Sequence, residues 1–273
     1  MTCFLAGHLI GWANHITRIA PLLWHENLFC LVLMEGPSLV ILRQEMKRII
    51  GKTIQKAEGN WKQGAEQFTG KKLRWIKTWG KHFLLRIGNV TIRTHFLLWG
   101  SYTIDRRKDR SATLTLQFEN GEVNFYSSSI RILEEPVEAL YDWRVDVMSR
   151  KWDAKYVRKL VRTHPSENVA DILLDQNIFA GVGNIIKNEV LFRLKLHPLT
   201  RVQDLNPKQI TALVDEAHRY SHQFYRWKKR FVLKKHYRIY HKGTCPECKS
   251  KLKAEKLGKR DRYTYYCPVC QAA

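Results

Sequence analysis

The sequence predicts an α+β fold: an N-terminal helix and a β-sandwich or barrel, then a helical region, then a small cysteine-bearing hairpin. Three observations support this prediction. β-rich segments are confined to residues 72–133, helical patterns begin near residue 149, and four cysteines lie close to the C-terminus. Strands and helices that occupy separate stretches of a chain are typical of this class. The 273 residues suffice for two domains of ordinary size. We expect four segments, with boundaries at 1–33, 34–150, 151–236 and 237–273.

The first 33 residues differ in composition from the rest of the chain. They are apolar, rich in His and Trp, and contain one Arg and one Glu. The apolar run Leu28–Met34 is too short to span a bilayer, and no basic region precedes it, so a signal peptide is poorly supported. We interpret the segment as an artefact of start-site assignment, with translation beginning at Met34. A genuine N-terminal arm is the alternative.

A helix and several short strands are predicted next. Ser38–Ile50 has apolar residues at helical spacing, with Ser38 as N-cap and Gly51 at the end. β-branched and aromatic residues then predict strands, and Asn120-Gly121 predicts a hairpin turn between the last two. The predicted strands are Phe83–Leu85, Thr91–Thr94, Ala112–Leu116 and Val123–Tyr126.

The second half of the chain has the spacing of helices. The last helix is long and amphipathic, with Asn206 as its cap and Pro207 in its first position. The predicted helices are Val157–Val161, Ala170–Asn177, Asn184–Leu194 and Pro207–Trp227.

Four cysteines near the C-terminus form two C-x-x-C pairs. Cys245 and Cys248 are separated from Cys267 and Cys270 by eighteen residues, in which Tyr263–Tyr266 favours a strand. Four thiolates at this spacing match one tetrahedral Zn²⁺ ion, and a site with four protein ligands is structural rather than catalytic. Two disulfides or four free thiols are the alternatives. The other two cysteines lie in the first 33 residues, so a secreted disulfide framework is not indicated.

The chain is strongly basic, with a formal charge of +22. Residues 151–273 carry 26 basic and 11 acidic residues. Such an excess indicates a polyanionic partner, and we favour nucleic acid over an anionic membrane surface. The cysteine-bearing tail contributes seven cations that can face phosphates, namely Lys249, Lys251, Lys253, Lys256, Lys259, Arg260 and Arg262.

A glycine-rich turn joins two of the predicted helices. Gly181 and Gly183 permit a tight turn and close approach of another group, and Asn184 then begins a helix. Because free backbone N–H groups at a helix N-terminus attract anions, this turn predicts a phosphate site. A plain helix hairpin is the alternative.

Five motifs in this order resemble the Fpg/Nei family of DNA glycosylases. They are Met34–Pro37, Trp79–Phe83, Thr94–Gly100, Leu174–Asn184 and Cys245–Gln271, so the resemblance covers the chain from Met34 onward. It implies an N-terminal helix and β-sandwich, a helix–two-turn–helix domain and a zinc finger. It also implies base excision repair: a damaged base is flipped out of double-stranded DNA. An N-terminal amine then attacks C1′ of the sugar, a Schiff base forms, and elimination nicks the strand.

The resemblance assigns a role to each matching residue. Met34 stands where relatives expose a proline amine; an α-amine is less basic than lysine and therefore a better nucleophile at neutral pH. Glu35 matches the catalytic acid, Lys81 a phosphate-binding hairpin lysine, Asn184 the phosphate-binding residue of the helical turn, and Arg262 the zinc-finger arginine that holds the phosphate beside the lesion. Read from the residues alone, Glu35 is a charge at its own helix start, and the two cations are solvated.

Substrate choice follows from the residues that fill the gap left by the flipped base. Leu97, Leu98 and Trp99 resemble the contiguous wedge of the endonuclease VIII branch, although Trp99 could instead pack in the core. Tyr126–Arg131, expected to be a second loop, lacks the Arg–Phe pair of the guanine-specific branch. We therefore favour oxidised pyrimidines. Ser38 stands where many relatives have Glu.

Two other functions share these binding features. A non-catalytic protein that binds damaged DNA or abasic sites would lack only the free amine at Met34. A zinc-ribbon transcription factor is disfavoured because it needs a recognition element inserted into a groove. We expect a monomer without a membrane anchor, located in the cytoplasm and associated with a bacterial nucleoid.

Overall fold

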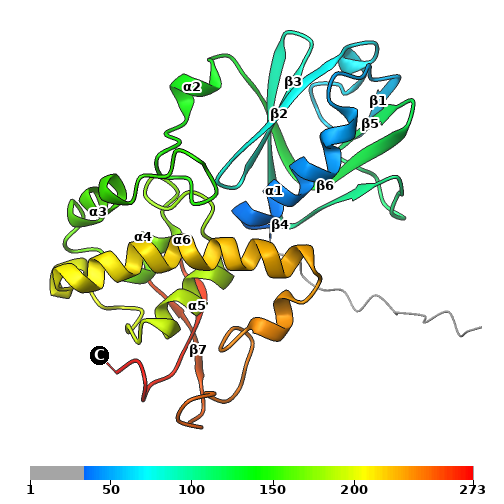
Figure 1. Ribbon diagram of the computed structural model, residues 1–273. Helices are drawn as coiled ribbons and strands as arrows, with labels where there is room; N and C mark the ends of the chain where they lie inside the picture. Colours follow the sequence, from blue (N-terminus) through cyan, green and yellow to red (C-terminus); the bar gives the residue numbers. More distant parts are fainter. Residues whose placement is uncertain (1–33, 273) are drawn as a thin grey trace, which may run out of the picture. The chain divides into compact units, whose positions relative to one another are not determined.

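The computed structural model describes residues 34–272 (Figure 1). Both interpretations of residues 1–33 concern a segment outside this range and stay predictions. The α+β class is confirmed by six helices and eight strands in the described chain. The helices are α1 (Gly36–Glu45), α2 (Val137–Leu140), α3 (Ala154–Arg162), α4 (Val169–Leu174), α5 (Asn184–Arg193) and α6 (Pro207–Lys229). The strands are β1 (Lys56–Glu58), β2 (Leu73–Trp79), β3 (His82–Ile87), β4 (Val90–Ile104), β5 (Leu114–Phe118), β6 (Gly121–Leu133), β7 (Lys253–Leu257) and β8 (Arg262–Tyr266).

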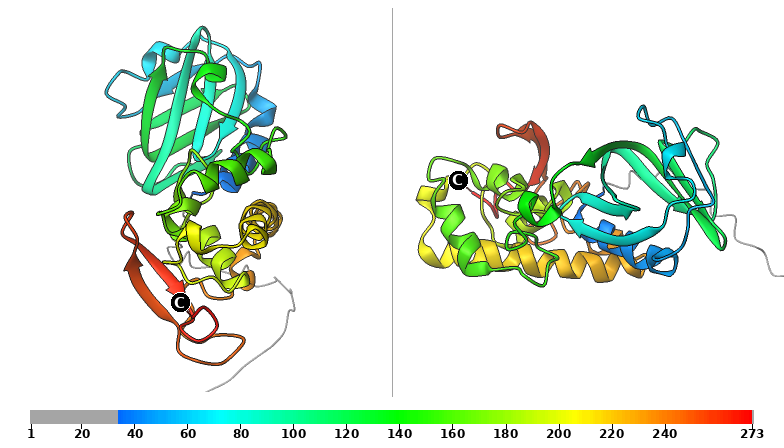
Figure 2. Two further views of the ribbon diagram at one scale, coloured as in Figure 1. Left: turned by 90° about the vertical axis from the view of Figure 1, so that its left-hand side faces the viewer. Right: turned by 90° about the horizontal axis from the view of Figure 1, so that it is seen from above.

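Strands β1 to β6 form one continuous antiparallel sheet in the order β1-β5-β6-β4-β3-β2. The sandwich expected from the sequence is thus built from a single sheet, whose long strands β4 and β6 change register between Phe96 and Ser101. Apolar side chains from all six strands share one core with α1, which packs against the sheet (Figure 2). The predicted hairpin joins β5 to β6, although its turn is Glu119-Asn120, because Phe118 pairs with Gly121.

Helix α1 begins earlier than predicted. Glu35, not Ser38, is its N-cap, and Pro37 in the first turn explains the earlier start, because a proline at this position leaves no N–H unsatisfied. Leu39 and Leu42 are fully buried against the sheet. Ser38 is buried as well, and its hydroxyl accepts a hydrogen bond of 2.6 Å from Lys228 Nζ.

The helical region has its own apolar core, formed by α3 to α6 and the segment that leads into them. The predicted cap of α6 is confirmed: Asn206 Oδ1 accepts from the Gln209 N–H at 2.9 Å, and Gln209 Oε1 accepts from the Asn206 N–H at 2.9 Å. Helix α4 is shorter than predicted, because its C-cap is Asp175 and a turn follows. Within residues 34–272, none of the helices combines the length and the hydropathy that crossing a bilayer requires.

Candidate active site and nucleic-acid interface

Three glycines bring distant parts of the chain into backbone contact. The Gly36 N–H donates to the Gly181 carbonyl at 2.9 Å, and a Cβ added to Gly36 would lie 2.7 Å from Gly181 Cα. Gly80, at the tip of the β2–β3 hairpin, has φ +52° and would place a Cβ 3.1 Å from the Gly181 N. No side chain fits at this junction. The junction therefore sets the positions of Glu35 and Lys81, which are the chain neighbours of Gly36 and Gly80.

Glu35 is the buried acid of this site, with 2% of its surface exposed. Its Oε1 accepts from the Ile185 N–H at 2.8 Å and its Oε2 from the Ile186 N–H at 3.4 Å, both in the first turn of α5. It makes no side-chain hydrogen bond to the start of α1, so the view of Glu35 as a charge that caps its own helix is wrong. Burial raises the pKa of Glu35, and attraction to Lys81 and the two α5 N–H groups opposes the rise. A carboxyl that keeps its proton at higher pH is suited to general acid catalysis.

The anion site predicted at the start of α5 is already occupied by the Glu35 carboxyl. Since Glu35 occupies the N–H groups of Ile185 and Ile186, those donors do not face a phosphate, and this part of the prediction is wrong. Asn184 does begin α5, and its Nδ2 donates to the Tyr263 carbonyl on β8 at 2.9 Å. The Asn184 side chain also hydrogen-bonds to Tyr240, so its amide is already engaged inside the protein and a phosphate contact would have to replace one of these bonds.

Lys81 lies in the two-residue turn between β2 and β3, where Trp79 pairs with His82. The side chain is half-buried. Burial lowers the pKa of Lys81, attraction to Glu35 raises it, and repulsion from Arg262 and Arg260 lowers it. Lys81 therefore lies within electrostatic reach of both Glu35 and Arg262.

The cations of the C-terminal hairpin are not all available to phosphates. Four of the seven are paired: Lys253 with Glu255 (3.7 Å), Lys256 with Asp261 (2.8 Å), Arg260 with Asp175 (3.1 Å), and Lys259 with Glu167. Arg262, the first residue of β8, has no carboxylate within ion-pair distance in residues 34–272. Lys249 and Lys251 likewise have no ion pair in this range, so these three cations are the ones left to meet an external anion.

Asp171 on α4 holds the tip of the same hairpin. Its carboxylate accepts from the Lys259 N–H at 2.9 Å and the Arg260 N–H at 3.3 Å, and it is only 5% exposed. A Cβ added to Gly258 would lie 2.6 Å from this carboxylate, so the hairpin backbone approaches α4 closely. Glu167 precedes α4, Asp171 lies on it and Asp175 is its C-cap residue, and the carboxylates of all three bind the hairpin. No local pattern in the sequence indicates this role, because the partners are about 90 residues away.

We expect Asp171→Asn to lower the thermal stability of the hairpin and to weaken DNA binding. The amide retains one acceptor oxygen but loses the charge that strengthens both hydrogen bonds, a loss of about 1.5–3 kcal/mol. Hydrogen exchange of the Lys259 and Arg260 amides measures the local effect, with Asp109→Asn, in an exposed loop, as the control. Unchanged exchange rates at both amides would contradict the assignment.

Helix α5 contributes two more polar residues that the sequence did not reveal as functional. Lys187, 1% exposed, donates from Nζ to Thr264 Oγ1 at 2.7 Å, and burial lowers its pKa to about 7. Asn188 Oδ1 accepts from the Tyr265 N–H at 2.8 Å. Together with Asn184, these side chains attach α5 to three successive residues of β8. One helix thus holds both the carboxyl of Glu35 and the strand that carries Arg262.

The predicted wedge is exposed at the register change of β4. Leu97, Leu98 and Trp99 have 51%, 50% and 63% of their surfaces exposed, so core packing of Trp99 is wrong. Tyr126–Arg131 is not a loop: it belongs to β6, where Ser128 pairs with Phe96 and Ser129 with His95. The wedge is therefore the exposed apolar element at this end of the sheet.

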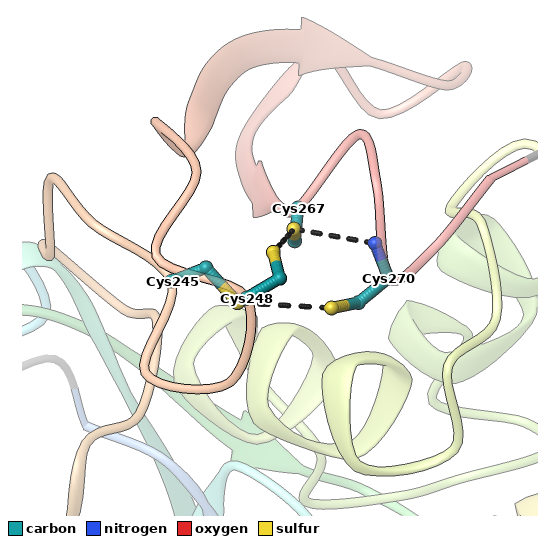
Figure 3. Close-up of side chains that lie close together, drawn as sticks. All are labelled: Cys245, Cys248, Cys267 and Cys270. Carbon is teal, nitrogen blue, oxygen red and sulfur yellow. Dashed lines mark hydrogen bonds between the residues drawn. The ribbon is translucent and has the colours of Figure 1, made fainter.

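The four cysteines of the tail converge on one point (Figure 3). Their Sγ atoms all lie within 4.8 Å of one another, and all four thiols are free, so the disulfide alternative is wrong. The two knuckles flank the β7–β8 hairpin, and Cys245 and Cys267 are fully buried in a small core with Phe192, Ile239 and Leu252. Four convergent thiols can hold a metal ion.

Comparison with known proteins agrees with this geometry. The formamidopyrimidine-DNA glycosylase H2TH domain matches residues 144–222. The chain is 35% identical over 214 residues to endonuclease 8-like 3 of Mus musculus, covering 75% of this chain and 35% of that protein. It is 28% identical to endonuclease 8-like L720 of Acanthamoeba polyphaga mimivirus, covering 72% and 85%.

Among solved structures, a Lactococcus lactis formamidopyrimidine-DNA glycosylase bound to DNA with an AP site superposes with a TM-score of 0.77 at 24% identity. The superposition covers 88% of this chain and 100% of that one. This likeness confirms the fold, including the helical region and the hairpin. The chain spans about a third of the length of the endonuclease 8-like 3 proteins that it matches. The H2TH match and the sequence similarity, together with the shared fold, support the family of formamidopyrimidine-DNA glycosylase and the endonuclease 8-like proteins, on the endonuclease VIII side.

Proposed function

We propose that this chain is a bifunctional DNA glycosylase and AP lyase of base excision repair, acting on double-stranded DNA. The observation that carries the proposal is the buried Glu35 carboxyl, held by α5 and facing Lys81 within reach of Arg262. Burying an acid beside two cations on separate elements costs free energy, and such groups are typical of functional sites. A nucleotide with an oxidised base fits this arrangement, because its sugar can accept a proton from the acid and its flanking phosphates can bind the cations.

The proposed reaction begins with the α-amine of Met34. Its lone pair forms a bond to C1′, the bond from C1′ to the damaged base breaks with its electron pair leaving on the base, and the departing base takes up the proton that the alkylated amine loses. Glu35 donates its proton to the ring oxygen, the sugar opens, and a Schiff base forms between C1′ and the amine. Loss of a proton from C2′ then expels the 3′ phosphate and nicks the strand. Lys81, Asn184 and Arg262 hold the phosphates that flank the sugar.

The chemistry requires Met34 to carry a free amine. The Met34 side chain is half-buried and packs against the core of the sheet, which fixes the adjacent backbone nitrogen beside Glu35. In a chain that continues upstream, this nitrogen is an amide and cannot attack. A form that starts at Met34 is therefore the proposed enzyme, and the longer form is the proposed non-catalytic binder of damaged DNA.

We propose that the four-cysteine cluster binds one Zn²⁺ ion. The donor set fits, because four thiolates that converge without an oxygen ligand or an open position are typical of structural zinc. When bound, the ion supplies folding energy to the tail rather than chemistry. By fixing the base of the β7–β8 hairpin, the cluster holds Arg262 toward the site.

Oxidised pyrimidines are the proposed substrates. The exposed Leu97-Leu98-Trp99 segment can enter the base stack as a contiguous wedge, and Tyr126–Arg131 belongs to strand β6 rather than to a second loop. A monomer in a DNA-containing compartment is expected. The related proteins from a mammal and a virus extend this expectation beyond the bacterial nucleoid.

Borohydride trapping on two forms of the chain tests the proposal. We expect the form that starts at Met34 to be trapped on duplexes containing thymine glycol or an abasic site, and peptide mapping to place the adduct on Met34. The 273-residue form is expected to bind the same DNA without forming an adduct. A duplex containing 8-oxoguanine is the substrate control and should be cleaved more slowly. An adduct on a lysine, or no adduct with either form, would contradict the proposed nucleophile.

A further inference from the structure

Two arginines lie directly opposite each other on the sheet. Arg93 on β4 pairs with Arg131 on β6, so both side chains project from the same face. Like charges in such a pair are destabilising, because the Cβ atoms of opposite residues lie only about 5 Å apart. No carboxylate lies within ion-pair distance of either arginine in the described part of the chain. The repulsion is therefore uncompensated within the protein.

The pair continues toward the candidate active site. His95 is two residues from Arg93 on β4 and hence on the same face, and it lies opposite His82, which follows Lys81. Burial lowers the pKa of His95, and repulsion from Lys81 and Arg93 lowers it further, so the imidazole is neutral at pH 7 and can donate one N–H. Ser129, opposite His95, adds a hydroxyl to this face. We call Arg93, His95, Ser129 and Arg131 the sheet track.

Arg93 is held in place rather than free in solvent. Its side chain is half-buried, it interacts with the hydroxyl of Tyr141, and its Nε is buried without a hydrogen-bond partner. An unsatisfied buried donor carries a cost of about 1–3 kcal/mol. Arg131 on the facing strand is exposed. A fixed and an exposed guanidinium side by side form a clamp for an anion that approaches from outside.

We propose that the sheet track binds the phosphate backbone of the nucleic-acid strand beyond the phosphate at Lys81. The inference rests on the proposed function for the path of the DNA strand, since Lys81 is the proposed phosphate contact from which the sheet track continues. Successive residues on one face of a strand are about 6.7 Å apart, so the pairs Arg93–Arg131 and His95–Ser129 form a patch two residues wide and two residues long. Arginine donors suit phosphate oxygens, and the absence of nearby carboxylates in residues 34–272 leaves both guanidinium groups for that purpose.

Arg131→Glu distinguishes a DNA-binding role from a structural one, because we expect it to raise the stability of the protein and to lower its affinity for DNA. The new carboxylate would pair with Arg93, so the melting temperature should rise, while affinity for a duplex with an uncleavable abasic-site analogue should fall about tenfold or more. The slope of log affinity against log salt should drop by about 1 for each arginine that contacts phosphate. Arg162→Gln removes an exposed arginine of α3 that likewise has no ion pair, and it should change neither slope nor affinity.

The double variant Arg93→Gln/Arg131→Gln gives a second measurement. A reduced salt slope with an unchanged rate of strand cleavage at saturating DNA supports the sheet track. A lower melting temperature with an unchanged salt slope would overturn it, since the arginines would then be structural. Binding is measured on DNA that cannot be cleaved, so this test does not depend on catalysis. If the wild-type protein never nicks DNA but the variant shows the reduced salt slope, only the proposed function is contradicted.

Discussion

Glu35→Gln is expected to lower the rate of base excision by about 10²–10⁴-fold, the usual contribution of a positioned general acid. Glutamine keeps the shape of the side chain and one acceptor oxygen for the Ile185 N–H, which lies 2.8 Å from Glu35 Oε1. The second hydrogen bond, to Ile186, is lost, so stability should fall by about 1 kcal/mol and the chain should remain folded. Single-turnover excision of thymine glycol measures the rate.

The pH dependence of the excision rate distinguishes a catalytic role of Glu35 from a structural one, because a purely structural contact would not change it. Because burial raises the pKa of Glu35 above its ordinary value of 4.5, its proton persists to higher pH and is lost as the pH rises through the folded pKa. Excision should therefore decline on the alkaline side in the wild-type protein, and this decline should disappear in the variant. Glu66→Gln, at an exposed position of the same domain, is the matched control. Excision by Glu35→Gln within a few-fold of wild type would remove Glu35 from the mechanism.

Removal of metal from the cysteine cluster is expected to unfold the tail and leave the rest of the protein folded. The tail core is small, comprising Phe192, Ile239, Cys245, Leu252 and Cys267, and it is distinct from the two larger cores. Zinc binding contributes about 10–16 kcal/mol to small domains of this kind, far more than such a core supplies. Amides in residues 253–266 should lose protection from hydrogen exchange upon chelation, while those in β3 and α6 keep it.

Removal of the metal should also lower DNA affinity by about 10- to 100-fold, because Arg262 is then no longer held in place. Cys267→Ser should reproduce the effect of chelation and bind less than one zinc per chain by atomic spectroscopy. In the 273-residue form, Cys30→Ser, outside the two C-x-x-C pairs, provides the control and should retain the ion. Full DNA affinity in a metal-free chain would separate the cluster from DNA binding.

Local patterns predicted the features that depend on neighbouring residues. The Asn206 capping box and the convergence of four cysteines follow from short-range chemistry, and the structure confirms both. The start of α1 was misplaced because Ser38 is a good cap in isolation, whereas Pro37 and the burial of Ser38 set the start one turn earlier. Such errors are small and affect element ends.

Long-range pairing explains the larger errors. The start of α5 has the pattern of a phosphate site, yet its N–H groups bind a carboxylate from 150 residues earlier. Lys259 and Arg260 read as solvent-facing cations, yet α4 binds them from more than 80 residues away. In both cases, the residues near the contact have no periodicity that indicates the distant partner. Only the fold shows which charges are neutralised internally and which, such as Arg262, are left for a ligand.

The attachment of Glu35 to α5 also bears on the protein during its synthesis. A ribosome has to add 150 residues after Glu35 before Ile185 exists to receive its carboxylate. Until then the side chain lies in water, where its acidity is ordinary and its proton is lost at neutral pH. An unfinished chain that starts at Met34 would thus carry the proposed nucleophile before Glu35 had been buried. The proposed glycosylase would gain its proton donor only once translation had passed α5 and this helix had docked against Glu35.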